Sequence, residues 1–167
     1  RRVDDAYCDP LELREDSMLG VPGLLNVARA GNVVLANPLG SGVLESRGLL
    51  PFLDACARYF LNEDLHLSSV ATWWCGQPKE LQHVLDQLDQ LVVKRSFPSV
   101  RKEPVFGRKL SDGERLALAA EMRARPEDFV GQDQVALSTA PVWLGHRLEP
   151  RPVVFRTYIA AAGSSYA

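Results

Sequence analysis

The sequence has few cysteines, and they lie far apart. Its 167 residues include three, Cys8, Cys56 and Cys75, with no C-x-x-C pair among them. An odd number of isolated cysteines argues against a disulfide scaffold and a zinc knuckle, and it favours a reducing compartment. We therefore expect the three thiols to be small buried hydrophobic groups.

Long apolar runs and dense basic runs are also missing. No uncharged apolar stretch reaches the roughly 18 residues that a membrane-spanning helix needs, and no basic-then-apolar leader opens the chain. The 19 basic and 21 acidic side chains give a formal net charge of −2, without the basic run that neutralising a nucleic-acid backbone requires. We expect a cytoplasmic protein that binds neither membranes nor nucleic acids.

What the sequence does contain is typical of a globular domain. Hydrophobic residues make up 46% and charged residues 24% of the chain, which excludes a disordered tail and provides enough apolar surface for a core. The chain starts at Arg1 without a methionine and ends in the strand-like segment 159–167. We expect it to be an internal piece of a longer protein.

Hydrophobic periodicity and turn residues predict an α+β fold. Apolar residues recur at helical spacing in three segments, and a Ser-x-x-Glu capping box at Ser111 precedes a fourth helix that Pro126 ends. Runs of β-branched or alternating residues predict strands. The predicted helices cover 22–30, 49–61, 79–88 and the segment between Ser111 and Pro126; the predicted strands cover 1–4, 32–36, 91–94, 129–137 and 152–160.

Acidic side chains gather near the start of the chain. Asp4 and Asp5 follow Arg2, and Asp9 and Glu12 come close behind. Oxygen ligands of this kind suit Mg²⁺, which usually shares them with substrate phosphates. The other interpretation is a solvated acidic turn with surface ion pairs worth roughly 0–1 kcal/mol, and the spacing leaves both open.

The loop 37–45 follows an apolar run. Gly40 and Gly42 permit backbone N–H groups to turn toward an anion, while Asn37 and Glu45 supply oxygens. The spacing matches neither a P-loop nor a G-x-G-x-x-G fingerprint. An anion-binding loop and an ordinary strand-to-helix turn are therefore both open.

Basic side chains are candidates for binding an anionic ligand at two places. Lys94 ends the apolar run 91–93, where its ammonium either serves as a point charge for a phosphate or extends to water. Arg151 and Arg156 belong to an alternating segment in which an arginine needs a carboxylate or a phosphate as its partner.

The histidines and tryptophans give weaker signals. His66, His83 and His146 are isolated and show no ligand spacing, and His83 is interpreted as structural because it lies on an amphipathic helix. We expect Trp73 and Trp74 to pack in the interior. No Ser/His/Asp or Cys/His group can be assembled from the sequence.

An ordered set of short motifs resembles the circularly permuted ATP-grasp proteins, type 2, distant relatives of glutathionylspermidine synthase. The motifs include RRVDDAYCDPLEL at 1–13, ANPLGSGVLE at 36–45 and QDQVALS at 132–138, with further matches at 16–24, 72–76, 93–99 and 151–156. The resemblance implies an ATP-grasp fold, in which two α+β subdomains close on ATP and Mg²⁺. It also implies a core segment 1–93, a lid-like segment 94–127 and a segment 128–167 that carries the hinge and phosphate-side strands.

The same resemblance implies a role for each candidate residue. Lys94 would contact the nucleotide, and Gln132, Gln134 and Val135 would belong to the hinge strand that meets adenine. Arg151 would lie near the phosphates, and Arg2 and Arg156 would act in catalysis. The residues on the metal side of the cleft would be Asp4, Asp5, Asn37 and Glu45.

The implied function is that of a ligase that uses ATP and Mg²⁺ to join a carboxylate to an amine or a thiol through an acyl phosphate. Phosphoryl transfer needs mainly cations, oriented donors and a metal, which the candidate residues supply. We expect the acceptor site to lie outside residues 1–167, so that this piece alone is inactive. The alternatives are a degenerate ATP-grasp module that binds a nucleotide or a protein partner without catalysis and, third, a phosphotransferase.

Overall fold

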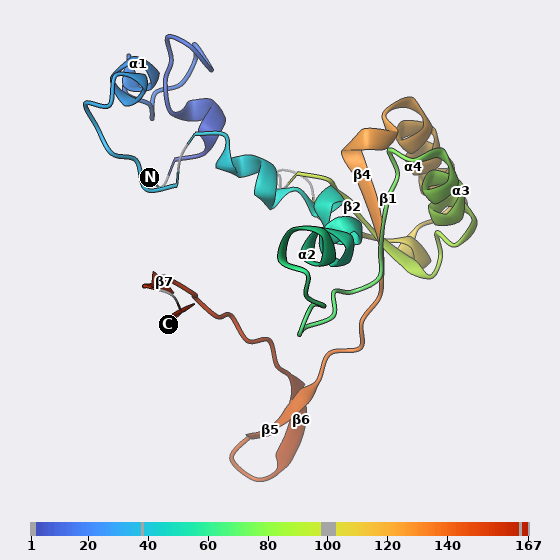
Figure 1. The fold of residues 1–167 in the computed structure, drawn as a ribbon. Coiled ribbons are helices and arrows are strands. Elements are labelled where there is room, and N and C mark those ends of the chain that lie inside the picture. The colour runs from blue at the N-terminus through green and yellow to red at the C-terminus, as the bar shows by residue number, and fades with distance from the viewer. Residues whose placement is uncertain (1–2, 38, 98–102, 164, 167) are drawn as a thin grey trace. The chain divides into compact units, whose positions relative to one another are not determined.

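The computed structural model describes residues 3–37, 39–97, 103–163 and 165–166. The chain divides into two compact units, Arg1–Asp133 and Gln134–Ala167. The first unit contains a four-stranded antiparallel sheet with strand order β1-β4-β2-β3 (Figure 1). Its strands are β1 (Thr72–Trp74), β2 (Leu91–Arg95), β3 (Val105–Phe106) and β4 (Phe129–Asp133).

Two helices cover one face of this sheet. They are α3 (Pro78–Asp86) and α4 (Asp112–Ala124), and together with strand residues they enclose the core (Figure 1). Close packing on this face leaves no room for a side chain at Gly131, because a Cβ atom there would lie 2.5 Å from the Val84 side chain of α3. The buried core consists of Cys75, Val84, Leu88, Leu91, Val93, Met122 and Phe129.

The strand register divides the side chains between the two faces of the sheet. Leu91 and Val93 point to the helix-covered core, so the alternate residue Lys94 belongs to the opposite face. Thr72 pairs with Gln132, and Gln132 pairs with Val92, which places Thr72 and Gln132 on the same face as Lys94. The sequence prediction of a strand at 91–94 is confirmed.

Capping and proline residues set the ends of α4. The Ser111 side chain accepts a hydrogen bond from the Glu114 N–H, and the Glu114 side chain accepts one from the Ser111 N–H, which completes the predicted capping box. The helix ends at Ala124, two residues before Pro126. The helix predicted at 79–88 is also confirmed, since Pro78 opens α3.

A 3-10 segment, η3 (Arg47–Phe52), leads directly into α2 (Leu53–Leu61). These elements replace the single helix predicted at 49–61, and Pro51 lies in the 3-10 part. Trp74 joins this segment to the sheet: its ring meets Phe52 edge to face with centroids 6.3 Å apart, and its indole N–H donates to the Glu127 carbonyl at 3.1 Å.

Most of residues 3–37 and 39–45 lack regular structure. The stretch contains η1 (Asp5–Tyr7), α1 (Leu24–Arg29) and η2 (Ser41–Glu45). The helix predicted at 22–30 is confirmed by α1. The strand predicted at 32–36 is wrong: Val34 is 95% exposed, and no strand pairs with it among the described residues. The strand predicted at 1–4 does not form at its described residues, 3 and 4.

The buried carboxylate of Asp9 organises this stretch. Its Oδ1 accepts hydrogen bonds from the Leu11 N–H at 3.0 Å and the Gly23 N–H at 3.1 Å, and its Oδ2 accepts one from the Leu25 N–H at 2.9 Å. The bond from Leu25 is the largest cause that holds the pKa of Asp9 below its ordinary value, and burial acts in the opposite direction. Asp9 thereby ties the first turn of α1 to a segment 16 residues earlier.

The second unit contains two hairpins that the sequence did not predict. They pair β5 (Thr139–Trp143) with β6 (Leu148–Pro152) and β7 (Ala161–Ala162) with β8 (Ser165–Tyr166). The strand predicted at 152–160 is wrong, since β6 ends at its first residue, and Phe155 is 87% exposed. Residues after Asp133 likewise leave the strand predicted at 129–137.

The cysteines follow the prediction in two of three cases. Cys8 and Cys75 are buried free thiols, and burial raises the pKa of Cys75 to about 12. Cys56, on α2, is exposed, so the expectation of a buried thiol is wrong there. No helix of the described residues combines the length and apolar character that crossing a bilayer requires.

Candidate functional site

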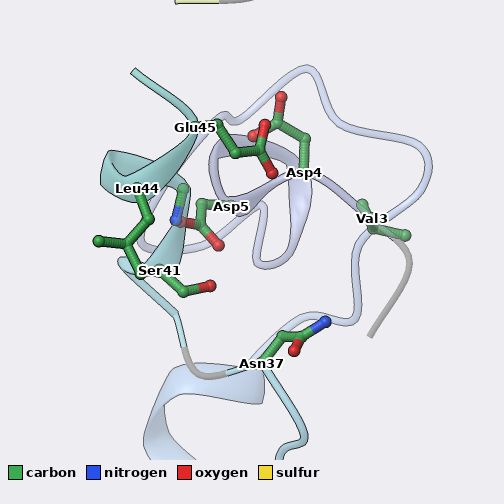
Figure 2. A pocket seen from close by; sticks show the side chains of 8 residues that line it. Val3, Asp4, Asp5, Asn37, Ser41, Leu44 and Glu45 are labelled. Atoms are coloured by element: carbon green, nitrogen blue, oxygen red, sulfur yellow. The ribbon is translucent and has the colours of Figure 1, made fainter. Parts of the chain in front are cut away.

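The residues predicted to hold a metal line one pocket. Its volume is about 540 Å³, and Asp4, Asp5, Asn37 and Glu45 all contribute to its wall (Figure 2). Asp4 and Asp5 lie at the start of η1, whereas Asn37 precedes η2 and Glu45 ends it, more than 30 positions later in the sequence. Three other side chains shown in Figure 2, those of Val3, Ser41 and Leu44, complete this acidic pocket together with Gly42.

Asp5 holds the glycine loop in place. Its Oδ2 accepts hydrogen bonds from the Gly42 N–H at 2.8 Å and the Gly40 N–H at 3.1 Å. Gly40 has a φ of 91°, a backbone conformation that favours glycine. The loop was expected to direct N–H groups toward an anion, and in the structure that anion is the Asp5 carboxylate itself.

The donor set of the acidic pocket suits magnesium better than a soft metal. Carboxylate and amide oxygens are the ligands that Mg²⁺ prefers. Within the described part of the chain, however, no three His, Cys, Asp or Glu side chains gather closely enough to hold a metal ion. A magnesium ion usually takes only one or two protein carboxylates and completes its shell with substrate phosphates and water, so the residues fit a shared site of that kind.

Lys94 projects from β2 on the sheet face opposite α3 and α4. Its half-buried ammonium donates a hydrogen bond to the Gln132 Oε1 at 2.5 Å. Burial is the largest cause that lowers the pKa of Lys94, and the positive charge of Arg47 lowers it further. The ammonium has three donors, and the structure gives it one acceptor among the described residues.

Gln132 is oriented by a second hydrogen bond. Its Nε2 donates to the Thr72 Oγ1 at 2.9 Å, and the Thr72 hydroxyl donates in turn to the Val70 carbonyl at 2.8 Å. Because that hydroxyl proton is committed to a carbonyl, the oxygen must accept, which turns the amide oxygen of Gln132 toward Lys94. The three side chains form a polar row across β1, β4 and β2.

Thr72 and Arg47 are not among the site residues that the sequence predicts. Arg47 donates from its backbone N–H to the Ser96 carbonyl at 2.6 Å and from Nη1 to the Arg95 carbonyl at 3.1 Å. The available signal for Thr72 was its place at the start of the family-like motif 72–76, directly before Trp73 and Trp74. Arg47 gave a cation two positions after the predicted ligand Glu45, a signal too common to single it out.

Arg95, next to Lys94, has a structural environment. Its guanidinium lies 4.0 Å from the centre of the Phe129 ring, forms an ion pair with Glu121 and approaches Asp128 at 3.7 Å. Because Arg95 faces α4 and Lys94 faces away from it, these two neighbouring cations lie in different environments.

The remaining predicted residues belong to the second unit or lie outside the described residues. Gln134, Val135, Arg151 and Arg156 belong to the second unit. Arg151, on β6, forms an ion pair with Glu149 at 2.9 Å, and Val135 and Arg156 are exposed. Arg2, the other predicted catalytic residue, lies outside the described residues.

Comparison with known proteins places the chain in a family. The family model described as circularly permuted ATP-grasp type 2 matches residues 1–167. An uncharacterized protein of Mycobacterium leprae is 38% identical over 164 residues, which are 98% of this chain and 29% of the relative. An uncharacterized protein of Synechocystis is 36% identical over 163 residues, which are 98% of this chain and 34% of the relative.

A third relative, an uncharacterized protein of Mycobacterium tuberculosis, is 38% identical over all 167 residues, yet the match covers 19% of its length. The chain therefore spans between about a fifth and a third of the length of these relatives. The chain belongs to the circularly permuted ATP-grasp type 2 family.

Proposed function

We propose that this chain forms the nucleotide-binding part of a ligase that uses ATP and Mg²⁺ to join a carboxylate to an amine or a thiol. The observation that carries the proposal is the environment of Lys94. Its ammonium is fixed by Gln132 on the sheet face without α3 and α4, and no carboxylate of the described residues forms an ion pair with it. A fixed cation without an acidic partner is suited to a phosphate.

The proposed reaction has two steps. A substrate carboxylate oxygen attacks the γ-phosphorus of ATP, the bond to the bridging oxygen breaks, and ADP leaves with its electron pair. The amine nitrogen or thiol sulfur then attacks the carbonyl carbon of the acyl phosphate, and inorganic phosphate leaves as the amine or thiol loses its proton. Charge builds up on phosphate oxygens in the first step, so a positioned lysine stabilises its transition state.

The acidic pocket is the proposed metal side of the site. Asp4, Asn37 and Glu45 would hold Mg²⁺ together with the phosphates, and Asp5 would shape the loop that carries two of them. When bound, Mg²⁺ supplies charge neutralisation at the phosphate oxygens.

The roles of the other predicted residues remain part of the proposal. Gln134 and Val135 would meet adenine, and Arg151 and Arg156 would lie near the phosphates or the acyl group. Arg2 would act in catalysis on the phosphate and metal side. The lid role of 94–127 is likewise a prediction, for a segment that contributes β3 and α4 to the sheet and its core. Location in the cytoplasm and kinship with glutathionylspermidine synthase belong to the same proposal.

A second candidate is a module that binds nucleotide without chemistry. Two observations favour it: in the described residues no three His, Cys, Asp or Glu side chains converge on a metal position, and Lys94 is not part of the acidic pocket. Such a module would bind ATP and release no ADP.

The experiment uses the full-length protein that contains this chain. Calorimetric titration with Mg-ATP tests binding, and an assay with a panel of small carboxylates and hydroxylamine tests activation, because hydroxylamine traps an acyl phosphate as a hydroxamate. We expect binding and carboxylate-dependent release of ADP with hydroxamate. Binding without either product would favour the second candidate, and no binding of Mg-ATP would contradict both.

A further inference from the structure

Arg47 lies where the chain leaves the acidic pocket and meets β2. It is the first residue of η3, and the Ser46 hydroxyl caps the start of that segment by accepting from the Gly48 N–H at 3.2 Å. The hydrogen bonds from Arg47 to the carbonyls of Arg95 and Ser96 fasten both its backbone and its side chain beside the end of the strand. Its guanidinium is thus held next to the residue that follows Lys94.

Arg47 approaches the same face of the sheet as Lys94. In the register, Trp74 pairs with Val130 and Val130 pairs with Lys94, so these three side chains form one cross-strand row. Gly48 packs on that row, since a Cβ atom at Gly48 would lie 3.1 Å from the Trp74 ring. The segment that begins with Arg47 therefore lies on the face from which Lys94 projects.

The two cations are not neutralised by protein carboxylates. Among the described residues, neither Arg47 nor Lys94 forms an ion pair, whereas Arg95 forms them with Glu121 and Asp128. The positive charge of Arg47 contributes to lowering the pKa of Lys94. Two neighbouring like charges disfavour each other, and an anion bound between them removes that cost.

Chain connectivity ties this pair of cations to the acidic pocket. Glu45 lines the pocket and precedes Arg47 by two residues. Since successive Cα atoms are about 3.8 Å apart, the Cα atoms of Glu45 and Arg47 are separated by at most about 7.6 Å. A polyphosphate bound at the cations would therefore have the proposed metal ligand Glu45 nearby.

We propose that Arg47 is a phosphate-binding residue that acts with Lys94 on the polyphosphate of the nucleotide. A guanidinium has five N–H donors in a planar fork that matches phosphate oxygens, and one of its nitrogens, Nη1, is used on the Arg95 carbonyl. The assignment rests on the proposed function for the identity of the nucleotide. It rests on geometry alone for the anion site.

The test compares ligands with and without phosphates on the full-length protein. Calorimetry measures the affinities for Mg-ATP, adenosine and inorganic tripolyphosphate in the wild type, in Arg47→Gln and in Arg58→Gln, an exposed arginine on α2 that serves as the matched control. We expect Arg47→Gln to weaken Mg-ATP and tripolyphosphate about tenfold or more and to leave adenosine unchanged. Arg58→Gln should change none of the three.

An unchanged affinity for Mg-ATP in Arg47→Gln, or an equal loss for Mg-ATP and adenosine, would overturn the assignment, because the second result is that of a purely structural residue. Arg47→Lys keeps the charge and covers the case in which Arg47→Gln does not fold. Its ratio of Mg-ATP to adenosine affinity should fall about threefold, and an unchanged ratio would contradict the proposal.

The proposed function can fail separately. Wild-type protein that binds tripolyphosphate through Arg47 but does not bind Mg-ATP would retain the anion site and reject the nucleotide. The reverse result, tight Mg-ATP binding that Arg47→Gln does not weaken, would support the proposed function and contradict the phosphate-binding role of Arg47.

Discussion

The two halves of the candidate site are built on different kinds of structure. Lys94, Gln132 and Thr72 stand on a sheet whose other face is closed by an apolar core. The acidic pocket stands on a stretch that has no strand among residues 3–37 and 39–45, and carboxylates hold that stretch together through bonds to backbone N–H groups. The half of the site with Lys94 therefore depends on burial, and the acidic pocket depends on the ionisation of single residues.

The largest effect should come from opening the core. Met122 is fully buried, whereas Met18, the control, is 96% exposed. Met122→Ala should destabilise the sheet by about 2–5 kcal/mol through lost burial and a cavity. Native-state hydrogen exchange in the full-length protein should show this loss in β2 and β4 but not around Leu25, and Met18→Ala should change neither.

Equal loss of protection in β2 and around Leu25 would show that the two regions open as one unit. That outcome would contradict the separation of a core-dependent half from a carboxylate-dependent half.

The second effect should come from acid. The pKa of Asp9 is held below its ordinary value, so its stabilisation is present above the unfolded-state pKa, near 3.9, and is lost as the pH falls through the lower folded-state pKa. Protection of the Gly23 and Leu25 amides, corrected for intrinsic exchange, should fall in that acidic window. Asp9→Asn should start with lower protection there and should not show this fall.

Loss of protection in β2 over the same acidic window as at Gly23 and Leu25 would argue against separate stabilisation of the two regions. An Asp9→Asn variant that keeps the wild-type pH dependence would contradict the role of Asp9, since another group would then be responsible.

A smaller effect should follow from disturbing the polar row without touching Lys94. Thr72→Val keeps the β-branched shape and removes the acceptor for Gln132. Loss of one hydrogen bond of about 0.5–1.5 kcal/mol should weaken Mg-ATP binding about two- to tenfold in calorimetry. Thr139→Val, in the exposed strand β5, is the matched control, and equal effects of the two changes would remove Thr72 from the site.

The elements that sequence patterns predicted are those with strong local signals. The capping box at Ser111, Pro78 at a helix start and the β-branched run before Lys94 each match the structure. By contrast, Pro141 and Pro150 face each other in the hairpin β5–β6, and proline normally argues against a strand. The run at 32–36 has β-branched residues without a partner strand, which local sequence cannot report.

The candidate site shows the same division. The resemblance to the family grouped Asp4, Asp5, Asn37 and Glu45, which do line one pocket, although their metal role stays a prediction. The bonds from Asp5 to Gly40 and Gly42 span 35 and 37 residues. Contacts of that length, and those of Thr72 and Arg47, depend on the packed fold and leave no local pattern.

The most direct test of the central claim is the affinity of the full-length protein for Mg-ATP when Lys94 is removed. In calorimetry, Lys94→Ala should weaken binding at least tenfold, which corresponds to about 1.4 kcal/mol. Lys79→Ala, which removes an exposed lysine from α3, should leave the affinity unchanged. Wild-type affinity in Lys94→Ala would contradict the account.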